Sequence, residues 1–163
     1  MTDILSLKVE ELVSKIKDSQ LTSVEICKKY IERVNEFEKD VRAWAHLNKK
    51  LLLEKAAEAD EHRRSGKPTG PLHGIPVAVK DIIGTLDMPT ECGTVIRKGK
   101  SYSQNAEIVD LLLSAGAIVM GKTATSELAY LGPSKTSNPH DYSRTPGGSS
   151  SGSTASVASF MAP

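Results

Sequence analysis

Two features of the sequence carry residue types that can do acid–base and nucleophilic chemistry. Lys80 ends a short apolar run, 77–79, and the segment 147–153 consists only of glycine and serine. Burial after an apolar run favours the neutral amine of a lysine, which can act as a base. Two glycines before Ser149 permit backbone geometry that other residues resist, close to an expected helix N-terminus that favours negative charge. We therefore interpret Lys80 and Ser149 as candidate catalytic residues.

Both features also have ordinary explanations. A lysine at the end of a strand is usually solvated, and a Gly/Ser run is usually a flexible linker. Here, however, the run leads directly into a segment with apolar residues at helical spacing, which is not typical of a linker. Asp81 follows Lys80 and is expected either to position it or to serve a surface or capping role. Thr125 and Ser126 stand at an expected helix start, where N-capping is the favoured role.

The stretch from Gly116 to Thr123 matches the phosphate-loop pattern letter for letter. A phosphate loop follows a strand and needs four residues that are free to curl around phosphate. Here a helix is expected before Gly116, and residues 117–120 are apolar and typical of a strand. We therefore reject nucleotide binding.

Apolar spacing predicts the elements that must position these residues. Helices are expected over about 5–16, 22–37 and 48–64, the second with a capping box formed by Thr22 and Glu25. A Gly/Pro-rich loop follows the third helix. The predicted order then becomes strand, helix and strand, which indicates a parallel or mixed sheet with helices packed on it. These later elements are the strand 75–80, the helix 106–115, the strand 117–120 and the helix 154–161.

Three ordered blocks of the sequence resemble the amidase signature family. The block from Leu72 to Asp81 is similar to the lysine segment of that family, 121–129 to its next block, and 144–153 to its Gly/Ser-rich signature. The resemblance covers essentially the whole chain. It implies one α/β domain, a mixed sheet covered by helices, of which residues 1–163 form the N-terminal part. A helical arm (1–64) would precede the start of the α/β core (65–163).

The same resemblance implies amide-bond hydrolysis through a Ser-cisSer-Lys triad and an acyl-enzyme. Lys80 would be the base, and Ser149 the bridging serine after a cis peptide bond. By the spacing of the family, the nucleophilic serine falls beyond Pro163, so we expect the 163-residue chain alone to be inactive. Strand edges and apolar surface would be left open where the rest of the fold should dock, so we also expect the isolated chain to be poorly stable or aggregation-prone. The implied substrate-binding residues are Gly147, Gly148, Ser150 and Ser151.

Three functions remain open at this point. The favoured one is a stand-alone amide hydrolase, because segments 132–134 and 138–140 look more like such enzymes. The first alternative is the amidase (glutaminase) subunit of a tRNA-dependent amidotransferase. The second alternative is a truncated, inactive fragment that serves as an interaction module.

Composition and residue spacing limit the classes of partner and cofactor that we expect. The chain has 21 Lys and Arg against 20 Asp and Glu, a net charge of +1, which does not favour a nucleic-acid surface. No apolar run approaches the ~20 residues that span a bilayer, and no signal-peptide pattern opens the chain, so we expect a cytoplasmic protein. The four histidines and two cysteines are not grouped at ligand spacing, and we expect no metal and no cofactor. The expected partners are a small-molecule amide substrate and further protein chains, in a homodimer or as partner subunits.

Overall fold

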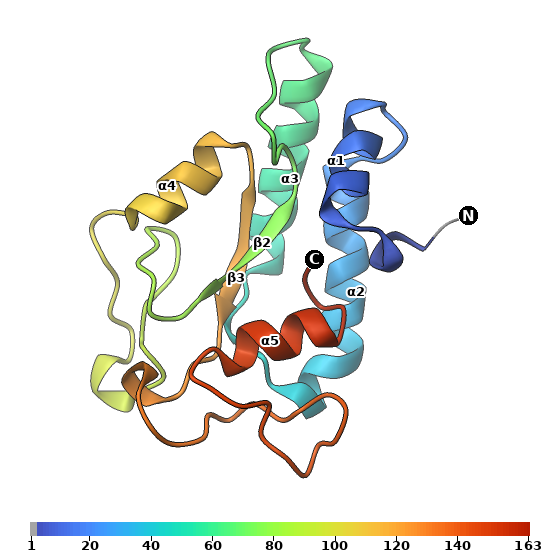
Figure 1. Ribbon diagram of the computed structural model, residues 1–163. Coiled ribbons are helices and arrows are strands. Elements are labelled where there is room, and N and C mark those ends of the chain that lie inside the picture. The colour runs from blue at the N-terminus through green and yellow to red at the C-terminus, as the bar shows by residue number, and fades with distance from the viewer. Residues whose placement is uncertain (1–2) are drawn as a thin grey trace.

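Three strands form a mixed sheet between helices (Figure 1). The computed structural model describes residues 3–163. The strands β1 (Trp44–His46), β2 (Pro76–Lys80) and β3 (Ile118–Thr123) lie in the order β1-β3-β2. β3 pairs in parallel with β2 and antiparallel with β1. The predicted mixed α/β architecture is confirmed.

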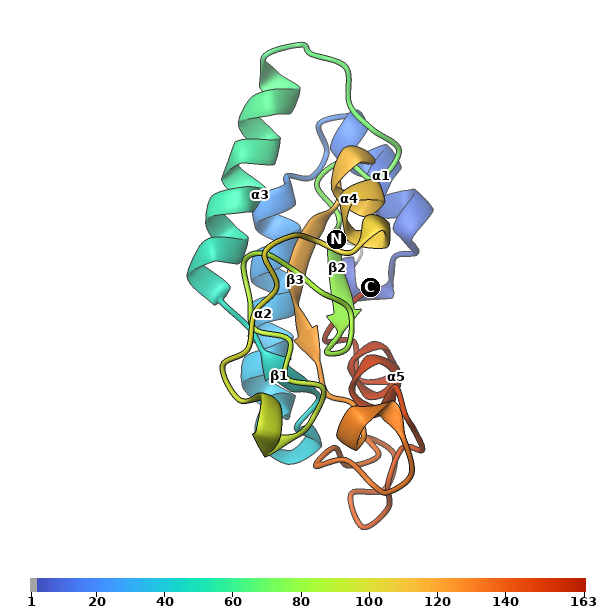
Figure 2. The same ribbon diagram turned by 90° about the vertical axis from the view of Figure 1, so that its left-hand side faces the viewer.

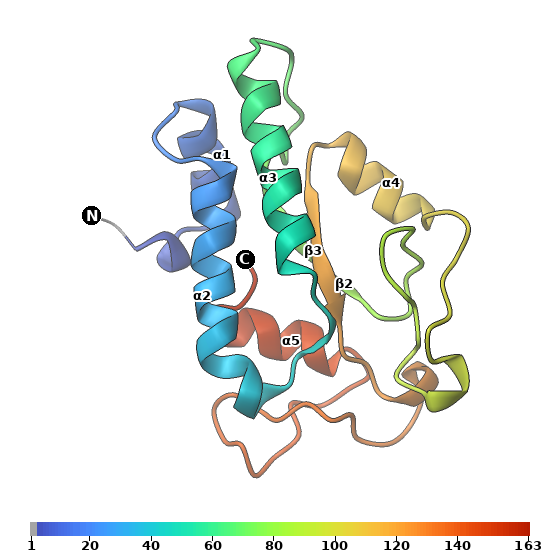
Figure 3. The same cartoon turned by 180° about the vertical axis from the view of Figure 1, so that it is seen from behind.

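Helices cover both faces of this sheet. In Figure 2, α3 (Lys49–Arg64) lies on one side of the strands and α5 (Ser151–Ala158) on the other. Beside α3, α2 (Ser23–Val41) runs antiparallel to it, as Figure 3 shows. The short helix α1 (Val9–Lys17) precedes α2, and α4 (Glu107–Ser114) connects β2 to β3. None of the helices described within residues 3–163 is long and apolar enough to cross a membrane.

The N-terminus of α2 is held from two directions. The Thr22 hydroxyl accepts from the Glu25 N–H at 3.1 Å, and Glu25 Oε2 accepts from the Thr22 N–H at 2.8 Å, so the predicted capping box is confirmed. In addition, the buried Asp60 on α3 accepts from the backbone N–H groups of Ser23 and Val24 at 2.8 and 3.1 Å. A carboxylate at a helix N-terminus satisfies free N–H groups and complements the helix dipole. Asp60 therefore ties α3 to α2.

Strand β1 was not predicted from the sequence. It has three residues between two long helices, which is too short for an alternating pattern to be read. It nevertheless brings the aromatic ring of Trp44 over β3, at Gly121. A Cβ built on Gly121 would lie 2.6 Å from the His46 carbonyl oxygen and 2.9 Å from the Trp44 ring, so only glycine fits there. The helix α5 also differs from expectation, because it begins at Ser151, inside the Gly/Ser run, rather than at Thr154.

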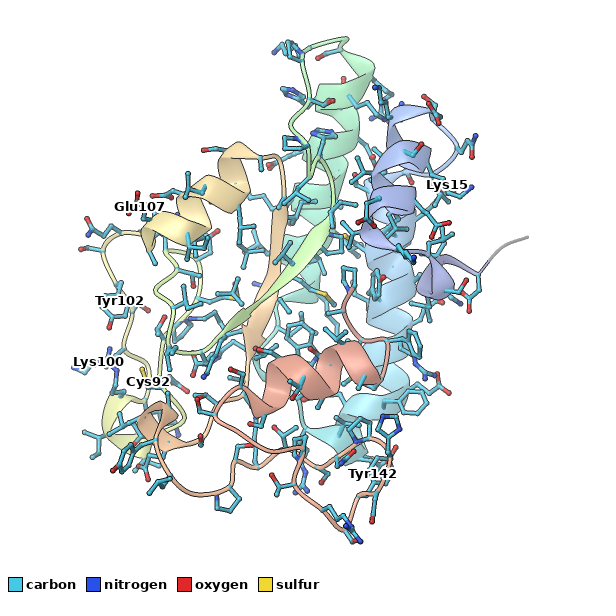
Figure 4. All side chains as sticks on the ribbon, in the orientation of Figure 1. Lys15, Cys92, Lys100, Tyr102, Glu107 and Tyr142 are labelled. Carbon is cyan, nitrogen blue, oxygen red and sulfur yellow. The ribbon has the colours of Figure 1, made fainter. Side chains whose placement is uncertain are left out.

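The connection between β2 and α4 is long and irregular. Figure 4 places Cys92, Lys100 and Tyr102 along it, on the side of the molecule opposite α1, where Lys15 is labelled. The connection is tied back to the end of β2, because the Cys92 N–H donates to the Asp81 carbonyl at 2.9 Å. It contains one short 3-10 helix, Val95–Arg97, whose apolar side chains Val95 and Ile96 are exposed.

Replacing Asp60 tests the link between the two long helices. The substitution Asp60→Asn should lower the free energy of unfolding by about 1–3 kcal/mol, because an NH2 group replaces one of the two oxygens that accept from Ser23 and Val24 and leaves a buried donor unpaired. Urea denaturation followed by circular dichroism measures this. The matched control is Glu61→Gln, next to it on α3, which removes an exposed ion pair to Arg64. Equal unfolding free energies for the two variants would contradict the assigned role of Asp60.

Candidate active site

Lys80 and Ser149 are in direct contact although they are 69 positions apart in the sequence. Lys80 is the last residue of β2, where it pairs with Thr123 at the end of β3. Its Nζ donates to the Ser149 Oγ at 2.6 Å. Both side chains are half-buried. The structure thus brings together the two residues that the sequence indicated as catalytic candidates.

The loop that carries Ser149 has an unusual backbone. The peptide bond between Gly148 and Ser149 is cis, as the family resemblance implies. Gly147 has a φ of 89°, a left-handed backbone conformation that residues with a side chain rarely adopt, so this position requires glycine. Gly147 and Gly148 are both exposed on the surface of the loop.

Three hydrogen bonds attach the loop to the end of β3. The Ser126 N–H donates to the Ser149 carbonyl at 3.1 Å, which fixes the residue that contacts Lys80. The Gly152 N–H donates to the Ala124 carbonyl at 2.9 Å. The hydroxyls of Thr123 and Ser153 share a hydrogen bond of 2.7 Å. Because all three bonds come from residues just beyond or at the end of β3, this strand end sets the position of Ser149.

Gly152 lies at the tightest point of this attachment. A Cβ built there would lie 2.3 Å from the Ala124 N and 2.3 Å from the Ala43 carbonyl oxygen. The same Ala43 oxygen accepts from the Ala124 N–H at 2.8 Å, so three backbone segments meet at this point. The role of Gly152 was not predicted from the sequence, because its partner segments lie far away in the chain.

The two other serines of the run differ in their surroundings. Ser150 is half-buried, and its carbonyl accepts from the Thr154 N–H in the first turn of α5. Ser151 is buried, and its hydroxyl donates to the Ser134 hydroxyl at 2.6 Å. The second contact ties the start of α5 to the segment 130–137.

The capping role predicted for Thr125 and Ser126 is wrong. Ser126 precedes a short 3-10 helix, Glu127–Ala129, but its side chain makes no capping bond. Within residues 3–163, the hydroxyls of Thr125 and Ser126 are buried and have no hydrogen-bond partner. A Cβ on Gly148 would lie 3.5 Å from the Ser126 Oγ, so this free hydroxyl faces the loop that carries Ser149.

A buried ion pair lies next to the site. Asp81, directly after Lys80, is 1% exposed, and Lys122 on β3 is 0% exposed. The Lys122 Nζ lies 3.4 Å from the Asp81 Oδ1. Burial lowers the pKa of Lys122 below its usual range, and the neighbouring Asp81 carboxylate opposes this shift. Lys122 was not predicted as a functional residue, although a lysine inside an apolar strand is itself a signal of a buried charge.

The site lies beside a cavity of about 490 Å³. Asp81, Thr125, Glu127 and Ser134 are among its lining residues. A second cavity of about 520 Å³ lies away from Ser149, against α3 and α4. No group of three or more His, Cys, Asp or Glu side chains within residues 3–163 is placed to hold a metal ion.

Comparisons with known proteins agree on one family. The family model "Amidase" matches residues 25–163. Among curated proteins, a subunit of the glutamyl-tRNA(Gln) amidotransferase of Thermobifida fusca is 38% identical over the whole chain, which spans 34% of that protein. The corresponding subunit of Chloroflexus aggregans is 39% identical, with 35% of its length spanned. The chain thus spans about a third of the length of the curated relatives it matches.

Solved structures show the same similarity in three dimensions. The peptide amidase of Stenotrophomonas maltophilia superposes with a TM-score of 0.90 at 36% identity, over 96% of this chain and 35% of that enzyme. A fatty acid amide hydrolase superposes with a TM-score of 0.90 at 28% identity, over 98% of this chain and 29% of that one.

A methyl group at Gly152 should displace the loop that carries Ser149. The substitution Gly152→Ala places a Cβ against two backbone atoms that cannot move aside, so we expect the free energy of unfolding to fall by about 1–3 kcal/mol or more. Chemical denaturation measures the loss. The control is Val157→Ala, because Val157 is on the same helix and exposed. A Gly152→Ala variant as stable as this control would contradict the tight contact.

Proposed function

The chain belongs to the amidase family, and we propose that the enzyme of which it forms part hydrolyses a C–N bond of a small-molecule amide through Lys80 and Ser149. The observation that carries the proposal is the 2.6 Å hydrogen bond from the Lys80 Nζ to the Ser149 Oγ. This contact is short enough for direct proton transfer between the two groups. The Ser149 that accepts this bond is held in place by the hydrogen bonds between its loop and the end of β3.

In the proposed reaction, Lys80 works as a base through Ser149. For this step the Lys80 amine must be neutral, so that it can accept the proton of the Ser149 hydroxyl. Ser149 in turn takes the proton of a second serine, which we propose lies after Pro163. That serine forms a bond to the amide carbonyl carbon. As the C–N bond breaks, the leaving nitrogen receives a proton from the relay and departs as the amine or as ammonia. Water then cleaves the acyl-enzyme and releases the acid.

Residues around Ser149 are proposed to contact the substrate. Gly147 and Gly148 are exposed and present backbone groups without a side chain in the way, which supports contact with an amide. Ser150 is half-buried and directly follows Ser149 in the loop. Ser151 is buried and donates its hydroxyl to Ser134, so it would act on the substrate indirectly, through Ser134, which lines the adjacent cavity.

Removing either member of the relay tests this function in the intact enzyme. Lys80→Met and Ser149→Ala should each lower kcat for amide hydrolysis by about 10²–10⁴-fold, because each removes a proton-transfer step. Release of ammonia or amine measures the rate, and circular dichroism checks the fold. The control Lys67→Met changes an exposed lysine in the loop after α3 and should leave the rate unchanged. A folded Lys80→Met variant with the rate of the unchanged enzyme would contradict the proposal.

A second function is favoured by the curated relatives. The proteins from Thermobifida fusca and Chloroflexus aggregans are both named as a subunit of a glutamyl-tRNA(Gln) amidotransferase. By analogy, the intact protein would release ammonia from glutamine as one subunit of a larger assembly. The proposed proton relay is the same in both functions, so they differ in substrate and in partner subunits.

A glutaminase assay separates the two functions. A stand-alone hydrolase should release ammonia from simple amides without any partner, whereas an amidotransferase subunit should release it from glutamine and do so faster when its partner subunits are present. Ammonia release from both substrates, with and without partner subunits, is the measurement. Acceleration only with partners and only on glutamine would favour the second function over the first.

A further inference from the structure

The ion pair of Asp81 and Lys122 is fully enclosed, and within residues 3–163 the Asp81 Oδ2 has no hydrogen-bond partner. The Lys122 Nζ donates to the Thr90 Oγ1 at 2.6 Å and to the Pro89 carbonyl at 3.2 Å, in addition to its contact with Asp81. These three acceptors match the three donors of an ammonium group. Asp81 Oδ1 also accepts from the Glu91 N–H at 3.2 Å. Several parts of the β2–α4 connection therefore converge on one lysine of β3.

The alternation of side chains along a strand relates this pair to the catalytic candidates. Residues opposite one another in a parallel pair point to the same face, and successive residues point to opposite faces. Lys80 is opposite Thr123, and Val79 is opposite Lys122. Lys80 and Thr123 thus face Ser149 and Ser153, while Lys122 lies on the other face of the sheet, where Asp81 meets it.

The end of β2 is fixed by this arrangement. The Asp81 N–H donates to the Thr123 carbonyl at 3.0 Å, and the Asp81 side chain is held by Lys122. Together, the backbone hydrogen bond and the ion pair restrain residue 81, which directly follows Lys80 in the chain. Stability alone does not explain the pair. Replacing a buried ion pair by well-packed apolar residues often leaves the stability of a protein unchanged or increases it.

We propose that Lys122 is a positioning residue, which fixes the end of β2 through Asp81 and thereby holds Lys80 against Ser149. The inference rests on the proposed function, since it assigns Lys122 to the same reaction. Lys122 lies on the face of the sheet opposite Ser149, so its effect would pass through the backbone. Thr90, as the closest acceptor of the Lys122 ammonium, completes the arrangement.

Kinetics of the intact enzyme test this role. Lys122→Met should lower kcat by about 10- to 100-fold, because a small displacement of a catalytic group is costly, while KM stays within about threefold. Asp81→Asn should have the same effect, and the double variant should lose no more than the worse single one, because the two residues act as a unit. The control is Lys100→Met, an exposed lysine of the same connection. Wild-type kcat in a folded Lys122→Met variant would overturn the inference.

A milder pair of variants decides the matter if Lys122→Met does not fold. Thr90→Val removes the hydroxyl that accepts from Lys122 but keeps the shape, whereas Thr90→Ser keeps the hydroxyl. We expect kcat to fall several-fold in the first and to match the unchanged enzyme in the second, again with little change in KM. Equal kcat in both would overturn the inference. A Lys80→Met variant with full activity would instead overturn the proposed function.

Discussion

The parallel pairing of β2 with β3 is the interaction on which the rest of the site depends. It sets Lys80 opposite Thr123 and so places both strand ends at the same edge of the sheet. The chain leaves β2 through Asp81 and leaves β3 through Ala124, and both exits stay bonded to the neighbouring strand or loop. Because parallel strands end together, residues from distant parts of the sequence can meet at this edge.

The loop that carries Ser149 needs small residues for a reason that is separate from chemistry. At Gly152 the loop lies so close to the backbone of Ala124 and Ala43 that there is no space for a side chain. This contact joins the start of α5 to β3 and to the residue before β1, so the loop that carries Ser149 is attached to the sheet at two places. A Gly/Ser-rich segment here is therefore a packed element, whereas composition alone would suggest a flexible linker.

The sequence predicted the regular elements better than the contacts between them. Helical spacing and the Thr22 capping box located α2, since both signals are local. Strand β1 was missed because three residues carry no readable period, and the free hydroxyl of Ser126 was missed because capping depends on geometry beyond the sequence. The meeting of Lys80 with Ser149 was expected only through the family resemblance. No local pattern can relate residues that are 69 positions apart.

The segment that imitates a phosphate loop has a different physical meaning in this fold. Its residues Gly121, Lys122 and Thr123 stand on successive positions of β3, so their surroundings alternate between the two faces. Gly121 leaves room for the Trp44 ring, Lys122 balances the buried charge of Asp81, and the Thr123 hydroxyl bonds to Ser153 at the start of α5. Each residue type is required by a separate contact. The match to a nucleotide motif thus follows from three contacts of one strand. β3 packs against β1, contacts the end of β2 through Asp81, and bonds to the start of α5.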